Sequence, residues 1–496
     1  MKMYEKKRLH PISVVENILK ELKDLLLPLI LVTIIGNKTI SSMWDIAVPS
    51  AFIIYTIAIG IVSWLRFTYW LEEGELRIEY GVFVRKKRYI PFERIQGISI
   101  SEGFLQRMVG VVKVKVETAS NQYGEAEAVL TAVTREEAKR LQYLLQKSKE
   151  IKEIVAKDES AIASSKHDQE LEQETKTVIF SMNVWEIFQV AVTSGGTFGV
   201  ISAIFLFISQ FDELIPYEKL YKDAQTFIAH GVFYTAAVVL FIFIAAYMVS
   251  VVQNMFKYAF FTVEKAGENI VISRGLLERK KVAIPIERVQ GIVIKENIIR
   301  RWFGYASVYV IYAGEAFNEG IRGSVVLCPL VKKKRIASVI LSCFPDYHVE
   351  HEFIAPPKRA RIRYMARPLY VLLAPVCLAA FWLRPWGFLL LLALPVAAYF
   401  GYLNYRTAGW AVSNHQLALR SRFLSVKTVY MLKSRIQSME ASYNLFQRRR
   451  RLGTIEATVA SGPGGTAGKV ADLDEEDVQT IYAWFQRTKE RQVLDE

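Results

Sequence analysis

The 496-residue sequence predicts an α+β membrane protein in which three transmembrane helical hairpins, about six spans, are each followed by a strand-rich module. Three observations lead to this fold class: paired apolar segments, a motif that recurs after each pair, and a basic composition. Hydrophobic residues make up 52% of the chain, and 63 Lys and Arg against 49 Asp and Glu give a formal net charge of +14. Disordered chains are less hydrophobic and fibrous chains carry a biased repeat, so both classes are excluded.

Six apolar segments approach the ~20 residues that a helix needs to cross the ~30 Å hydrocarbon core of a bilayer. Connectors within a pair are short, whereas a long polar stretch follows each pair. The first segment, which Lys38 interrupts, and the short fifth segment carry the weakest signal. For the short segments a buried core helix or a re-entrant turn is the alternative. The six segments are residues 25–44, 46–65, 187–209, 227–252, 369–383 and 386–403.

Basic residues flank the predicted hairpins on one side only. Arg66 follows the second segment, and four arginines lie between residues 359 and 367, just before the fifth. The connector 210–226, in contrast, carries four acidic residues against two lysines. Because short loops rich in Lys and Arg stay in the cytoplasm, we expect the N-terminus, the three modules and the C-terminus on the cytoplasmic side.

The motif R-[IV]-Q-[GS]-[IM] recurs once after each pair of apolar segments. Its flanks keep step: Gly110 and Gly304 lie sixteen residues after the motif arginine, and we match Gly453, at eighteen, in the third copy. That copy departs from the pattern, because Ser438 replaces the motif glycine. The signature residues are Arg94, Gln96, Gly97, Arg288, Gln290, Gly291, Arg435 and Gln437.

Each copy combines short strands with one terminal helix. Apolar and charged residues alternate over 112–117, the period of a half-buried strand. Thr134 and Glu137 form a capping box that predicts a helix over residues 135–149. Asp472 with Glu475 is expected to open the matching helix of the third copy.

Together these features resemble the bacterial pleckstrin-homology-like (PH) domain family of membrane proteins, of the YdbS/YdbT type. The resemblance covers nearly the whole chain, apart from an acidic, serine-rich linker at 152–177. It implies a PH-like β-sandwich or partly open barrel of about seven strands in each copy, closed by its C-terminal helix, in a multi-pass protein of the bacterial cell membrane. It also implies a link to envelope maintenance or antimicrobial-peptide tolerance, and a smaller single-module relative as partner.

The expected organisation alternates hairpins and modules. It comprises an interfacial helix with the first hairpin (1–66), the first PH-like domain (67–150), a polar linker (151–178), the second hairpin (179–256), the second PH-like domain (257–347), a basic linker (348–367), the third hairpin (368–404) and the third PH-like domain (405–496).

Two sets of residues are candidates for ligand binding. The signature arginines and glutamines could hold a phosphate headgroup, but bracing a turn between strands is the favoured interpretation. The basic-aromatic stretches before Gly110, Gly304 and Gly453 are the better candidates for lipid or partner contact, because a cation near an anionic membrane gains ~1 kcal/mol. These candidates are Arg107, Arg300, Arg301, Trp302, Arg448, Arg449, Arg450 and Arg451.

No catalytic, cofactor or metal site is predicted. Pro463 and Val470 break the P-loop pattern in the glycine-rich stretch 461–469, and the three cysteines lack ligand spacing. We therefore expect a non-enzymatic membrane scaffold whose modules bind anionic lipid headgroups or a partner protein, with no nucleic-acid partner. The alternative is a flippase-like exporter of lipid or peptide. Transport pathways are usually marked by charged residues inside the spans, and Lys38 and His230 are the only ionisable residues that we find there, which argues against an exporter.

Overall fold

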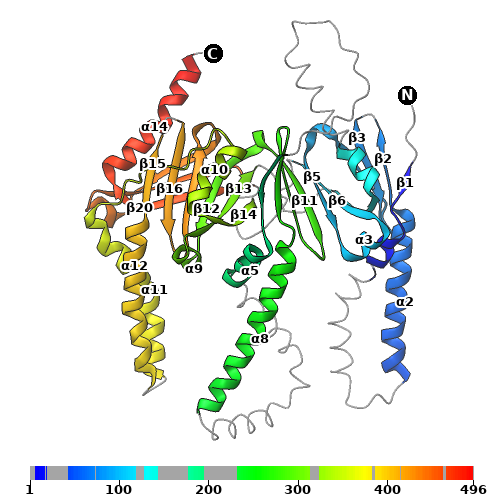
Figure 1. The fold of residues 1–496 in the computed structure, drawn as a ribbon, viewed down its shortest axis with the longest axis horizontal. Coiled ribbons are helices and arrows are strands. Elements are labelled where there is room, and N and C mark those ends of the chain that lie inside the picture. The colour runs from blue at the N-terminus through cyan, green and yellow to red at the C-terminus, as the bar shows by residue number, and fades with distance from the viewer. Residues whose placement is uncertain are drawn as a thin grey trace.

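The protein contains three successive modules of one design, with the long apolar helices projecting from the same side of each (Figure 1). The computed structural model describes residues 6–16, 18, 43–72, 74–118, 128–142, 177–194, 232–312, 323–382, 386–413, 415–461 and 465–494. Within each module a first antiparallel sheet leads through one 3₁₀ turn into a second antiparallel sheet, and a helix follows the last strand. This confirms the mixed α+β class and the repeated strand-rich modules.

The first module is built from residues 7–142. Its N-terminal strand β1 precedes the apolar helix α2 in sequence but pairs with β2, which follows that helix. Its elements are β1 (Lys7–Arg8), α2 (Met43–Arg66), β2 (Thr68–Glu72), β3 (Glu75–Tyr80), β4 (Lys86–Pro91), η1 (Phe92–Arg94), β5 (Ile95–Glu102), α3 (Phe104–Val109), β6 (Val111–Thr118) and β7 (Ala128–Thr134).

The second module repeats this order. Its elements are β8 (Thr177–Ser181), α5 (Val184–Thr193), α8 (Val232–Tyr258), β9 (Thr262–Ala266), β10 (Asn269–Arg274), β11 (Arg279–Pro285), η2 (Ile286–Arg288), β12 (Val289–Glu296), α9 (Ile298–Trp302), β13 (Tyr305–Tyr312), β14 (Ser324–Lys332) and α10 (Lys333–Cys343).

The third module lacks an N-terminal edge strand and has a single bridge, Ile354 with Trp410, in that place. Its elements are η3 (Lys358–Ala360), α11 (Arg361–Trp382), η4 (Trp386–Leu392), α12 (Ala393–Thr407), β15 (Gly409–Val412), β16 (Gln416–Arg422), β17 (Val426–Leu432), η5 (Lys433–Arg435), β18 (Ile436–Ser442), α13 (Leu445–Arg448), β19 (Leu452–Val459), β20 (Thr466–Asp474) and α14 (Glu475–Leu494).

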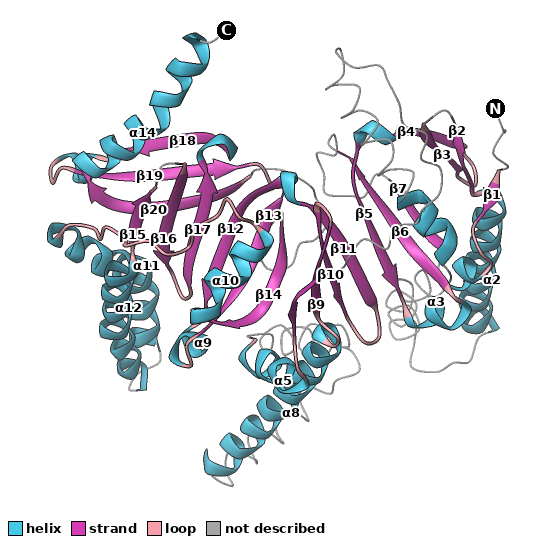
Figure 2. Cartoon of the chain, turned by 45° about the horizontal axis from the view of Figure 1, so that its top comes forward, coloured by secondary structure: helices cyan, strands magenta, loops and turns pink. Residues whose placement is uncertain are grey.

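The modules share sheets, which the sequence did not predict. The second sheet of module one continues into the first sheet of module two, in the order β7-β6-β5-β11-β10-β9-β8. The second sheet of module two likewise continues into the first sheet of module three, in the order β14-β13-β12-β17-β16-β15. Both joins are antiparallel, and Figure 2 shows the resulting row of sheets.

The hydrophobic cores also cross the second join. Val293 and Ile311, from the second module, are fully buried in the core of the third. Ala418 and Tyr430, from the third module, are buried in the core of the second. Burial of each large aliphatic side chain stabilises the folded state by roughly 1.5–3 kcal/mol. Modules two and three are therefore packed into one body and are not separate modules joined only by a linker.

In the described residues, two helical segments are long and apolar enough to cross a membrane, Lys358–Trp382 and Gly387–Thr407. They match the expected fifth and sixth spans and pack closely: a Cβ on Gly401 would lie 2.5 Å from the Tyr364 carbonyl oxygen. Helices α2 and α8 overlap the expected second and fourth spans. The expected first span and most of the third lie outside the described residues, so the count of six stays a prediction.

Two local expectations in the third copy are wrong. The residue equivalent to Gly110 and Gly304 is Arg451, sixteen residues after the motif arginine, because all three adopt the left-handed conformation, with φ of +74°, +71° and +50°. Gly453 instead lies within β19. Asp472 does not cap α14, since it belongs to β20 and its side chain is fully buried.

Candidate membrane-facing lipid site

A β-hairpin tip of each module lies where a long apolar helix meets the module. Arg66, the last residue of α2, donates to the Val82 carbonyl oxygen in the β3–β4 turn at 2.5 Å. The Leu276 amide of the β10–β11 turn donates to the Phe256 carbonyl oxygen of α8 at 2.9 Å. In module three, Arg420 of β16 donates to the carbonyl oxygen of Thr407, where α12 ends, also at 2.9 Å.

These tips expose large apolar side chains beside the helices. Phe83 is 85% exposed and Phe423 is 81% exposed, values that are unfavourable in water and favourable against lipid. The full set of exposed tip residues is Phe83, Val84, Leu276, Leu277, Phe423 and Leu424. We call them the hairpin-tip set. Their exposure depends on the hairpin geometry, so the residue types alone did not identify them.

The short helices α3, α9 and α13 provide the basic-aromatic residues that the sequence singled out. Arg107, Arg301 and Arg448 occupy the same position in the three copies, and each is partly or fully exposed. Apolar neighbours are exposed beside them, with Trp302 reaching 90%. Arg449, Arg450 and Arg451 are exposed at the end of α13. Exposed Phe104, Met108, Ile299, Phe303, Leu445 and Phe446 complete this surface.

Arg300, in contrast, is buried and bonded within the protein. Its guanidinium donates to Thr193 Oγ1 at 2.9 Å and to the Pro329 carbonyl oxygen at 2.9 Å, and it also bonds to Ser307. Burial lowers the pKa of this guanidinium. Arg300 therefore fastens α9 to α5, and we leave it out of the lipid-binding set.

The equivalents of Arg300 do the same in the other modules. Gln106 donates to Glu16, in the segment before the first expected span, at 2.6 Å. Gln447 donates to Asp472 at 2.8 Å. Asp472 in turn accepts from Arg363, at 3.0 Å, and from Arg367, both in the first turns of α11. A buried polar side chain thus anchors each short helix to the segment that leads into, or begins, an expected span.

The signature residues lie where one sheet of a module leads into the next. Arg94, Arg288 and Arg435 end the 3₁₀ turns η1, η2 and η5. The register of the following strand shifts at the signature glutamine in all three copies, between Ile95 and Gly97, between Val289 and Gly291, and between Ile436 and Ser438. Such a bulge bends a strand, which agrees with a role in bracing the turn.

Gln290 and Gly291 show this role in detail. The Gln290 side chain is buried and donates to the Arg288 carbonyl oxygen at 3.2 Å. Burial lowers the pKa of the Arg288 guanidinium. A Cβ on Gly291 would lie 2.9 Å from the Tyr430 carbonyl oxygen of the next module, so a side chain here would push the joined strands apart.

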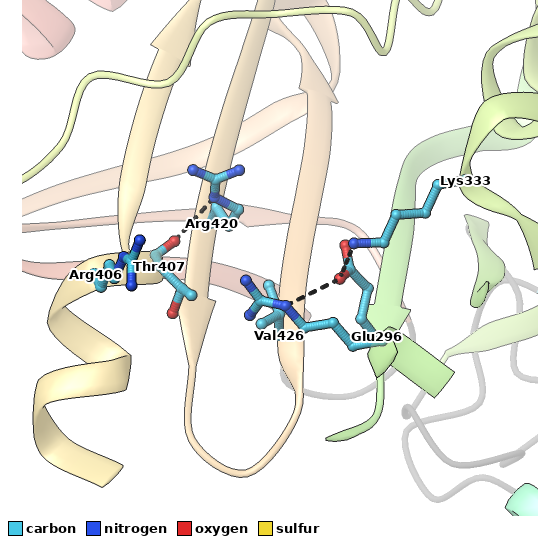
Figure 3. Close-up of a pocket in the computed structure, with 7 residues that line it drawn as sticks. Glu296, Lys333, Arg406, Thr407, Arg420 and Val426 are labelled. Carbon is cyan, nitrogen blue, oxygen red and sulfur yellow. Dashed lines mark hydrogen bonds and ion pairs between the residues drawn. The ribbon is translucent and has the colours of Figure 1, made fainter. Parts of the chain in front are cut away.

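A pocket of about 120 Å³ lies where modules two and three meet, next to the end of α12 (Figure 3). Four cationic side chains and one carboxylate line it, so the carboxylate neutralises only part of the positive charge. Glu296 pairs with Lys333 at 2.6 Å and with Arg301 at 3.9 Å. The lining residues are Glu296, Arg301, Lys333, Arg406, Thr407, Arg420 and Val426.

Two arginines of β16 are partly desolvated in this region: Arg420, which lines the pocket, and Arg422, which does not. Burial lowers the pKa of Arg420 and of Arg422, so an anion that offset their charge would be stabilised here. The Nε of Arg422 is buried and has no acceptor within the part of the chain that the structure describes. The first join carries a related pair, Glu102 with Arg135 at 2.9 Å.

In the described residues, no group of three or more His, Cys, Asp or Glu side chains could hold a metal ion. Cys328 and Cys343 are buried, and burial raises the pKa of both thiols. Residues 195–199 read Gly-Gly-Thr-Phe-Gly, and the G-x-x-x-G spacing is typical of close helix packing, but this segment lies outside the described residues.

Comparison with known proteins agrees with this architecture. The family model described as Bacterial PH domain matches the chain three times, at residues 18–149, 203–343 and 369–489. The chain is also 37% identical, over 98% of its own length and 99% of the relative's, to the UPF0699 transmembrane protein YdbT of Bacillus subtilis (strain 168). With three matches in a membrane-associated chain, this protein belongs to the bacterial PH domain family.

Proposed function

We propose that this protein is a multi-pass scaffold of the cytoplasmic membrane whose three PH-like modules lie on the cytoplasmic side and bind anionic lipid headgroups. One observation, repeated in all three modules, carries the proposal: an exposed apolar hairpin tip and a short helix with exposed arginine lie beside the apolar helices. Apolar side chains that enter the interface, with arginines at headgroup depth, are the usual composition of a membrane-contacting surface.

The pocket between modules two and three is the best-defined headgroup site. Arg301 and Lys333 come from one module and Arg406 and Arg420 from the next, so a phosphate placed between them would contact both modules. A guanidinium binds phosphate through paired charge-assisted hydrogen bonds. Thr407, the last residue of α12, lines the pocket just beyond the sixth expected span. If α12 crosses the bilayer, the pocket would lie close to headgroup depth, which supports the proposal.

Lipid retention by the full-length protein tests the proposal. The protein would be extracted in mild detergent, exchanged into lipid nanodiscs of phosphatidylcholine with a minor share of phosphatidylglycerol, and assayed for enrichment of phosphatidylglycerol around it. The variant Arg301→Gln with Lys333→Gln removes two cations that are 40% and 42% exposed. At ~1 kcal/mol for each cation, enrichment should fall by about tenfold or more.

The control is the neighbouring pair Lys334→Gln with Arg335→Gln, which removes the same charge from exposed positions of α10 outside the pocket. Enrichment should stay near the wild-type level in this control. Equal losses in both variants would reduce the effect to net charge, and no loss in either variant would refute the headgroup site.

A further inference from the structure

Each end of the row of sheets carries a strand with an open side. Among the described residues, β4 pairs with β3 alone, and β18 pairs with β19 alone. Residues 86–89 of β4 are exposed, as are Ser438, Glu440 and Ser442 of β18. An unpaired strand edge presents free backbone donors and acceptors and is a template for another strand.

The two open strands are the counterparts of strands that pair inside the chain. By position in the repeat, β4 corresponds to β11 and β17, and β18 corresponds to β5 and β12. The chain joins β5 to β11 and β12 to β17, both antiparallel. What remains unused is one strand of each kind, β18 at one end and β4 at the other.

The two internal joins use one register. Arg279 lies opposite Glu102 at the first join, and Val426 lies opposite Glu296 at the second. These are equivalent positions, because the repeat offset is 194 residues between copies one and two and 147 between copies two and three when the motif arginines are aligned. The pairing geometry is therefore a property of the repeat.

The basic character of β4 does not protect it from pairing. Lysines on an exposed edge usually discourage association. Yet β11 carries Arg279, Lys280 and Lys281 at the positions of Arg85, Lys86 and Lys87, and β11 is paired. The same residue types in the same places are thus compatible with this join.

We propose that β4 of one copy pairs with β18 of a second copy of this chain, in the register of the internal joins. That register sets Lys86 opposite Ser442, Lys87 opposite Ala441 and Arg88 opposite Glu440. Glu440 lies opposite another carboxylate, Glu456, within its own sheet. A basic residue on its free side therefore offsets a repulsion, since charges opposite each other in a sheet interact directly.

The first join is the closer template for this contact. It pairs four residues, Arg279–Val282 with Ser99–Glu102, and ends before the motif glycine. The second join reaches Gly291, where a Cβ would lie 2.9 Å from a backbone oxygen. Ser438 occupies that position in the third copy, so the four-residue join is the one that β18 accommodates.

Such a contact is heterologous, joining two different surfaces, and so repeats from copy to copy into a ring or an open row. The long apolar helices α2, α8, α11 and α12 project from one side of the row (Figure 1). A further join of the same geometry keeps the next copy's helices on that side too, which a shared membrane requires.

Disulfide cross-linking in native membranes tests the register. Two differently tagged full-length chains would be co-expressed, one with Lys86→Cys and one with Ser442→Cys, both with Cys377→Ser to remove the one exposed cysteine described. Opposed residues in an antiparallel pair lie ~4.5–5.5 Å apart between Cα atoms, within disulfide reach. The expected product is an oxidant-dependent species of two chains that contains both tags.

Two controls fix the meaning of that product. Lys86→Cys with Ser438→Cys is four residues out of register, about 13 Å, and should cross-link at least fivefold less. Ser101→Cys with Lys280→Cys, which lie opposite each other at the first join, should form an internal disulfide and show that such joins oxidise. Equal yields in and out of register, or capture of a different protein by either cysteine instead of a second copy, would overturn the proposal.

Discussion

Asp472 shows that one buried side chain can connect two separate parts of the fold. Its fully buried carboxylate accepts hydrogen bonds from Gln447 and from Arg363 and Arg367 of α11, so it joins the third module to a predicted span. The sequence predicts a helix N-cap at this residue, because an Asp three residues before a Glu fits a capping box. Its two arginine partners lie more than 100 residues away in sequence, and no local pattern reveals them.

Replacing Asp472 should loosen the third module from α11. Asp472→Asn leaves two arginines without their carboxylate. Because the arginines are partly exposed, we expect the free energy of unfolding to fall by about 2–4 kcal/mol, less than for a fully buried ion pair. We expect faster tryptic cleavage at residues 359–367 of the full-length protein. The matched control, Asp474→Asn, breaks a more exposed pair with Arg359 and should change the rate little. Equal cleavage of the two variants would contradict this role.

Glu137 predicts an acid-sensitive contact at the N-terminus. Burial raises the pKa of this carboxyl. Hydrogen bonds from Lys7 and Tyr69 are among the interactions that together lower it by more than burial raises it, so the net shift of the pKa is downward. A depressed pKa means that the contact is fully present above pH ~4.5 and is lost as the pH falls through the lowered value.

Hydrogen exchange of residues 7–10 measures this contact. Protection from exchange, corrected for the intrinsic pH dependence of amide exchange, should be high at neutral pH and should be lost as the pH falls through the lowered pKa; in Glu137→Gln, which removes the charge, it should be low at both pH values. Exchange in that variant that still depended on pH as in the wild type would assign the transition to another group.

The two buried cysteines predict a simple reactivity pattern. Burial raises the pKa of Cys343 to about 12, and that of Cys328 is raised well above its usual range. Because the thiolate is the reactive form, neither should react with maleimide at pH 7 in the folded protein. Labelling counted by intact mass should rise by two sites on denaturation of a Cys377→Ser variant; labelling of either site before denaturation would contradict the burial.

At the scale of elements, the sequence predicted strands and helices well wherever the signal is local. Alternation over residues 112–117 corresponds to β6, and the expected cap is confirmed by the Glu137 amide, which donates to Thr134 Oγ1 at 3.3 Å. The sequence did not show that Arg300 is buried and Arg301 is exposed. The helix α9 has five residues, too few to show a helical period, yet one arginine is buried and the other lines the pocket.

The joins between modules were also beyond the sequence. Hydrophobic periodicity shows which face of a strand is buried but not which distant strand pairs with its edge. The contrast between β12, buried along residues 289–294, and β18, largely exposed, becomes meaningful only when the partner strands are seen.

Gly291 provides a test of the second join. Gly291→Val places a side chain against the Tyr430 backbone and should cost about 1–3 kcal/mol, with faster hydrogen exchange in β17. Ser438→Val, at the equivalent position of the open strand, is the control and should leave exchange within the third module unchanged. If β17 exchanges alike in the two variants, Gly291 does not hold the join.

At the scale of the whole molecule, the excess of positive charge has two structural uses. One set of arginines, with Arg300, Arg363 and Arg367, is spent on contacts inside the protein. The other set, with Arg301 and Arg448, is exposed near the membrane helices. Composition alone indicated a membrane protein, but only the fold separates the arginines that hold modules in place from those available to lipid.

If the apolar helices cross the bilayer, the hairpin-tip set touches it, whereas α14, which projects from the opposite side of the third module to α11 and α12, does not (Figure 1). An environment-sensitive fluorophore on Phe423→Cys, in the Cys377→Ser full-length protein reconstituted in vesicles, measures this directly. The control label is on Gln479→Cys, an exposed residue of α14. We predict blue-shifted emission that a lipid-borne nitroxide quenches at position 423 and water-like, unquenched emission at position 479. Water-like emission at both positions would contradict the account.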